Sequence, residues 1–108
     1  MDPGVSKMRE RDIELVRGSR NVFRDFGDPD ADLKQAKAVI AARVIAVLDE
    51  RELTVRGAAS LTGFAAADFS RLRNADLSRF TLDRLMRMLG ALDKRTRITI
   101  RIEPVPAN

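Results

Sequence analysis

The chain has 108 residues, the size of one domain, and its 44% hydrophobic and 33% charged residues are typical of a folded globular protein. It contains neither histidine nor cysteine, which excludes disulfides, thiol nucleophiles, zinc ribbons and the commonest general base. We therefore expect neither enzyme activity nor a cofactor. A net charge of +4 and an isoelectric point near 10.3 favour a polyanionic partner.

No apolar run approaches the ~20 residues of a membrane helix, and the N-terminus lacks the layout of a secretory signal, so we expect a cytoplasmic protein. Residues 1–11 are charged and aperiodic, which predicts a flexible terminus before a single domain over 12–104. The alternation from Asp12 to Val16 is compatible with a short strand. A turn at 18–21 and apolar contacts follow, the latter from Val22, Phe23 and Phe26.

A long helix is predicted from residue 29 to about residue 51. Asp28 suits its N-cap, and Pro29 suits its first position. Apolar residues recur on one face at helical spacing, at Leu33, Ala36, Ile40, Val44, Val47 and Leu48.

Two short helices are predicted next, over residues 54–61 and 66–73. Thr54 caps the first, and Gly63 closes it in a left-handed conformation. Ala59 is the small residue that a close helix crossing needs. Phe64, Phe69 and Leu72 would anchor the second helix, leaving Ala66, Ala67, Ser70 and Arg71 outward. This pattern over 54–74 predicts a helix-turn-helix.

A fourth helix is predicted after Thr81, with Phe80 and Leu85 as a hydrophobic staple. Its apolar face is formed by Leu82, Leu85, Met86, Leu89 and Leu92. Strict alternation then predicts a strand over 97–103, which Pro104 ends. This strand needs a partner, either residues 12–16 or the same strand of a second molecule. We favour the second molecule, with a dimer interface at Ile98, Ile100 and Ile102.

The fold class is thus mainly α: a repressor-like domain of four to five helices with a helix-turn-helix and a C-terminal β-strand. Within it, LTVRGAASLTGFAAADFSRLRN (53–74) resembles the phage-repressor-like (XRE) helix-turn-helix family. The shared positions are Leu53, Thr54, Ala58, Ala59, Leu61, Gly63, Ser70, Arg71 and Leu72.

The flanking segments are similar to the HigA-type antitoxin subgroup of that family. GSRNVFRDFGDPDADLKQAKAVIAARV (18–44) resembles its lead-in, and FTLDRLMRMLGALDKRTRITIRIEP (80–104) resembles its fourth helix and closing strand. The resemblance implies a homodimer that binds double-stranded DNA, represses its own operon and neutralises a small RelE-like toxin.

The same motif places the DNA-binding residues, and this chain departs from the family there. Val55 stands where the family usually has glutamine, and alanines 65–67 replace the polar start of the reading helix. Alanine can touch only a thymine methyl group, and Asp68 would repel phosphate. The predicted DNA-binding residues are Thr54, Val55, Arg56, Ala65, Ala66, Ala67, Ser70, Arg71, Arg73 and Asn74.

Simpler interpretations stand beside these. The two short helices could merely pack in an all-α domain, and Arg71, Arg79 and Arg84 could be solvated surface charges rather than DNA contacts. For function, we favour a sequence-specific repressor of its own operon. The alternative is a protein-interaction module, a toxin-neutralising antitoxin with weak or lost DNA binding.

Overall fold

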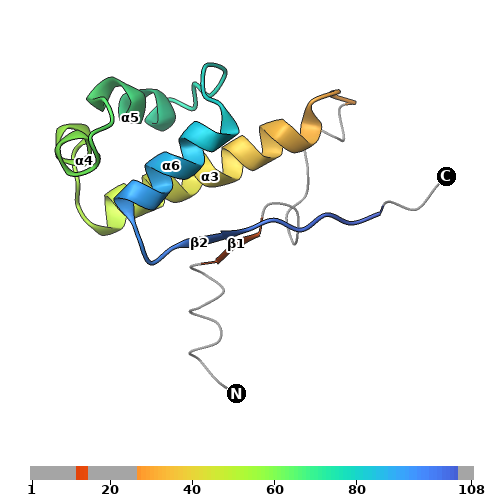
Figure 1. Ribbon diagram of the computed structural model, residues 1–108. Helices are drawn as coiled ribbons and strands as arrows, with labels where there is room; N and C mark the ends of the chain where they lie inside the picture. Colours follow the sequence, from red (N-terminus) through yellow and green to blue (C-terminus); the bar gives the residue numbers. More distant parts are fainter. Residues whose placement is uncertain (1–11, 15–26, 105–108) are drawn as a thin grey trace.

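The computed structural model describes residues 12–14 and 27–104. Their elements, in chain order, are β1 (Asp12–Glu14), α3 (Ala31–Glu50), α4 (Val55–Thr62), α5 (Ala66–Arg73), α6 (Leu82–Leu92) and β2 (Arg97–Thr99). In Figure 1, α4 and α5 lie on one side of the paired helices α3 and α6, and the two strands lie on the other. This confirms the mainly α fold with a C-terminal strand. The terminus over 1–11, the turn at 18–21 and the contacts Val22, Phe23 and Phe26 lie outside the described residues.

Helix α3 begins later than the sequence pattern predicts. Its N-cap is Asp30 rather than Asp28, because the Asp28 carboxylate accepts the Asp30 N–H at 2.8 Å and the Lys34 ammonium at 2.6 Å. The hydrogen bond from Lys34, followed by that from Asp30, holds the pKa of Asp28 below its usual value. Asp28 therefore forms a turn that precedes the helix, and Pro29 lies in that turn.

The core lies where α3 and α6 face each other. Five of the six apolar residues predicted for α3 are buried there: Ala36, Ile40, Val44, Val47 and Leu48. Leu33 is the exception, with 43% of its surface exposed. It belongs to the first turns of α3, which extend past the end of α6 (Figure 1), and no other helix within residues 27–104 covers it.

Helix α6 is fixed at both ends. Its N-cap Thr81 accepts the Arg84 N–H at 3.3 Å, and Phe80 and Leu85 are both buried, as expected of the staple. At the other end, the Arg51 guanidinium donates to the Leu92 carbonyl at 2.6 Å and joins the ends of α3 and α6. Met88 is fully buried although it was not assigned to the apolar face, whereas Leu82 and Met86 are only partly buried.

The strand is shorter than the alternating sequence predicts. β2 covers Arg97–Thr99, and residues 100–103 lie outside it. The reason is the partner: β1 has three residues and pairs with β2 in parallel, Ile13 opposite Ile98. β2 thus pairs within the chain, which is the alternative to the dimer that we favoured. A strand has two edges, so the interface at Ile98, Ile100 and Ile102 stays a prediction.

No helix in the described part of the chain is long and apolar enough to cross a membrane.

The turn between α4 and α5 gives a test of its backbone conformation. Gly63 has φ +84°, and a Cβ built there meets nothing within 4 Å, so only the left-handed backbone disfavours a side chain. Gly90 in α6 also faces open space, but its backbone is helical. Gly63→Ala should lower the free energy of unfolding by about 1 kcal/mol, and Gly90→Ala should raise it by about 0.5–1 kcal/mol. Urea unfolding followed by circular dichroism measures both, and stabilisation by both substitutions would contradict the assigned turn.

Candidate nucleic-acid interface

Helices α4 and α5 form a helix-turn-helix; α5 has the predicted boundaries, and α4 ends at Thr62, one residue later than predicted. The Thr54 hydroxyl accepts the Gly57 N–H at 3.0 Å and caps α4, and the Gly63 N–H donates to the Ala59 carbonyl at 2.8 Å and closes it. The small residue that is fully buried in α4 is Ala58, whereas Ala59 is only partly buried. The buried small residue of α4 is therefore Ala58, one position before the predicted Ala59.

The packing of α5 determines which of its side chains are outward. Phe69 and Leu72 are buried in the core, and Phe64 in the preceding turn packs against it. On the opposite side, Ala67 and Asn74 are exposed, and Ala66, Ser70 and Arg71 are half-buried. The structure therefore brings the predicted reading residues together on one face of α5, with Ala65 exposed at its start.

The first turn of α5 has no side-chain cap. Its N-cap residue, Ala65, has the extended backbone of a cap (φ −66°, ψ 141°) but no oxygen to accept an N–H. Helix α4 has such a cap at Thr54, so the two helices of the motif begin differently. The Asp68 N–H donates to the Ala65 carbonyl at 3.0 Å, whereas the N–H groups of Ala66 and Ala67 are left for water or for a bound anion.

Asp68 does not lie where the sequence led us to expect it. We expected a carboxylate that faces and repels phosphate, but only 8% of the residue is exposed. Its two oxygens accept from Arg71 at 2.9 Å and from Arg84 at 2.6 Å. The partner Arg84 lies in α6, sixteen residues along the chain, so no local pattern could indicate this pair. The pairing of Asp68 with both arginines is the feature of this site that the sequence analysis missed.

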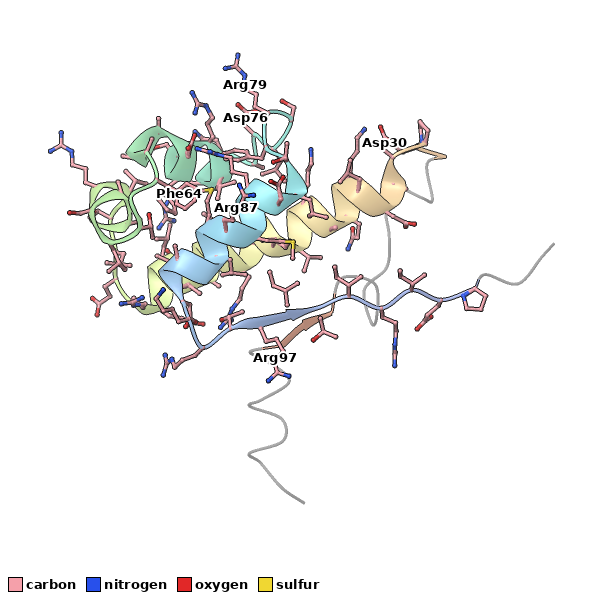
Figure 2. The ribbon with its side chains drawn as sticks, in the orientation of Figure 1. Asp30, Phe64, Asp76, Arg79, Arg87 and Arg97 are labelled. Atoms are coloured by element: carbon pink, nitrogen blue, oxygen red, sulfur yellow. The ribbon has the colours of Figure 1, made fainter. Side chains whose placement is uncertain are left out.

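Arg84 joins the turn of the motif to α6. Its guanidinium carbon lies 5.2 Å from the centre of the Phe64 ring, a cation–π contact, while the same group donates to Asp68. Figure 2 labels Phe64 between the motif and α6, with Arg79 extending from the loop beyond. Arg84, one of the arginines considered as DNA contacts or surface charges, is thus held by protein contacts. Arg79 is exposed and has no carboxylate partner among the described residues.

The other arginines near the motif differ in whether they have a carboxylate partner. Arg73 donates to Asp49 of α3 at 3.0 Å, which ties the end of α5 to the end of α3. Arg87 lies 3.3 Å from Asp83, and the hydroxyl of Thr81 holds the pKa of Asp83 below its usual value, so Asp83 is charged at neutral pH. Arg56, at the start of α4, is exposed and unpaired within the described part of the chain.

The predicted dimer residues become progressively more exposed along the chain. Ile98 packs against the core, Ile100 is 55% exposed and Ile102 is 92% exposed. Ile100 and Ile102 are two exposed apolar side chains two residues apart on one segment. The C-terminal segment therefore offers an apolar edge, separate from the face of α5.

The absence of a side-chain cap at Ala65 allows the start of α5 to be tested by substitution. Ala65→Ser supplies a hydroxyl at a backbone that already has cap geometry, so the free energy of unfolding should rise by about 0.5–1 kcal/mol. Ala67→Ser makes the same change inside the first turn, where serine is a poorer helix former, and should lower stability by a few tenths, roughly 0.3 kcal/mol. Urea unfolding of both variants checks the pair. Equal effects would contradict the position of the helix start.

Comparison with known proteins agrees with this geometry. A family model described as a helix-turn-helix domain matches residues 22–103, well over half of the chain, and spans all four described helices. No curated protein and no solved structure matched the chain. Helix-turn-helix domains are DNA-binding modules whose second helix enters the major groove. The chain therefore belongs to this helix-turn-helix family.

Proposed function

We propose that the protein is a sequence-specific DNA-binding transcriptional regulator that reads the major groove with α5. The observation that carries the proposal is the outward face of α5, which brings Ala67, Ser70, Arg71 and Asn74 together opposite the buried Phe69 and Leu72. A helix anchored on one side and open on the other is what insertion into a groove about 12 Å wide requires.

Affinity is proposed to come mainly from phosphate contacts. Arg56 and Arg79 are exposed cations without carboxylate partners in the described residues, and Thr54 and Val55 begin α4 beside Arg56. Arg73 is a weaker candidate, because Asp49 already neutralises it. Contacts of this kind position a protein on DNA without reading sequence.

Specificity is proposed to come from the first two turns of α5. Ala65, Ala66 and Ala67 offer methyl groups, which suit thymine, while Ser70 and Arg71 offer hydrogen-bond donors. Asn74 lies one turn further on, at the end of the helix. Because three of these positions are alanine, Arg71 is the side chain best suited to discriminate between base pairs.

The regulator is proposed to act as a homodimeric repressor of its own operon. Two reading helices related by a two-fold axis would meet successive major grooves about 34 Å apart and block the polymerase. The proposed interface is the edge of β2 that β1 does not occupy. In an antiparallel pair centred on Ile100, Arg97 lies opposite Glu103 of the second copy and Ile98 opposite its Ile102, so charges and apolar groups match.

A second candidate function is a protein-interaction module. The exposed Ile100 and Ile102 and the alanine-rich start of α5 favour it, because the apolar edge is ready for a partner while the reading face is poor in polar groups. In this form of the proposal the partner is a small RelE-like toxin, which is what the resemblance to HigA-type antitoxins implies. In this form of the proposal, DNA binding is weak and neutralising the toxin is the main role.

DNA binding is tested by a salt titration on two duplexes, one from upstream of the gene and one with the same bases scrambled. We expect the upstream duplex to bind at least a hundredfold more tightly near physiological salt, since specific binding typically exceeds non-specific binding by ~10³ or more. Fluorescence anisotropy measures both affinities. Equal binding that is lost together as salt rises would leave only backbone attraction and favour the interaction module.

The dimer is tested by a charge on the apolar edge. Ile102→Lys should convert a dimer into a monomer in sedimentation equilibrium, because an edge lysine opposes strand pairing. Leu33→Lys is the matched control, since Leu33 is also exposed but lies on α3. An unchanged dimer in the Ile102 variant would place the interface elsewhere.

A further inference from the structure

Three charged side chains meet between α5 and the first turn of α6. Asp68 and Arg71 are one helical turn apart on α5, and Arg84 is in the first turn of α6. One carboxylate oxygen lies 2.9 Å from Arg71 and the other 2.6 Å from Arg84. The side chain of Asp68 is 12% exposed, whereas those of Arg71 and Arg84 are 39% and 45% exposed. The Asp68 carboxylate is therefore buried, and the guanidinium groups of Arg71 and Arg84 extend from it towards the surface.

This arrangement fixes the direction of Arg71. A free arginine on a helix surface samples many rotamers, and ordering it costs free energy when it binds. Here Asp68 holds one guanidinium nitrogen, and Asp68 is itself held by burial and by Arg84, which also contacts the Phe64 ring. A guanidinium carries five N–H donors, so the contact to Asp68 leaves donors for a second acceptor.

We propose that Asp68 is the positioning residue that determines how well this protein discriminates between DNA sequences. It holds Arg71 in one orientation for a base edge and offsets part of the local charge that would attract any phosphate. The inference rests on the proposed DNA binding through α5. It makes Asp68, which faces the protein rather than the DNA, a determinant of specificity.

Removal of the Asp68 carboxylate should strengthen binding to DNA of any sequence and weaken the discrimination between sequences. Without the carboxylate, two arginines next to the reading helix are released and the local charge rises by one. Attraction to any duplex then increases, because non-specific affinity follows the number of phosphates neutralised. Discrimination falls, because an unheld guanidinium loses the fixed geometry on which a bidentate base contact depends. A residue that only stabilised the fold would produce neither effect.

The test is Asp68→Asn, which removes the charge with little change in shape. The readout is the ratio of affinities for the upstream and scrambled duplexes, measured across a salt series. We expect tighter binding to the scrambled duplex, a salt slope steeper by up to about 0.9, and a ratio lowered about tenfold, within the roughly 5- to 150-fold that a bidentate base contact supplies. Partial unfolding does not disturb the readout, because it lowers both affinities alike and cancels in their ratio.

Asp83→Asn is the matched control. Asp83 is exposed in the first turn of α6 and pairs with Arg87, so the substitution makes the same charge change close by without touching Arg71. Binding to both duplexes should tighten together, with the ratio kept within about twofold. A fall in the ratio as large as that for Asp68→Asn would show a general charge effect and overturn the proposal.

Arg71→Lys completes the experiment and does not depend on whether Asp68→Asn folds. Lysine keeps the charge but lacks the planar fork, so the ratio should fall about tenfold. The double variant should fall no further than the single variants, because both remove one interaction. Additive losses, or a ratio unchanged in either single variant, would overturn the inference. A wild-type ratio near one would instead overturn the proposed DNA reading itself.

Discussion

Helix α5, the second helix of the motif, depends on burial, because a helix of eight residues is not stable alone in water. Phe69 and Leu72 supply that burial, in a core formed largely by α3 and α6. Their positions also fix the rotation of the helix about its axis, so the outward face is a consequence of the packed one. The geometry needed to read DNA thus follows from two apolar side chains on the other side of α5.

The arginines on α5 are paired with carboxylates, whereas arginines further away are not, and the net charge of the chain does not show this difference. The arginines at α5 that could meet DNA have carboxylate partners, Asp68 for Arg71 and Asp49 for Arg73. Arg56 and Arg79, away from α5, are unpaired in the described part of the chain. Unpaired arginines thus flank α5, whose own arginines are paired, and in the proposed function this separates attraction to phosphate from contact with bases. The exposed apolar edge after β2 lies apart from both.

Local signals in the sequence predicted helix ends of the motif well, whereas contacts between distant residues left no signal that could be recognised. Thr54, Gly63 and Thr81 act through contacts within three or four residues, so both ends of α4 and the start of α6 could be predicted from the sequence almost to the residue. The direction of Asp68 depends on Arg84 in another helix, and the length of β2 depends on a strand far earlier in the chain. Neither contact produces a periodic pattern in the sequence. The sequence patterns therefore predicted an Asp68 that faces phosphate and a strand longer than the observed β2.

The most direct test of the central claim is a backbone amide NMR titration of the protein with the upstream duplex. Reading by α5 predicts that the largest chemical-shift changes fall on residues 65–74 and at the start of α4, residues 54–56, while α3 and β2 change little. Changes confined to the C-terminal segment, or spread weakly over every basic surface, would contradict the assignment of α5 as the reading helix.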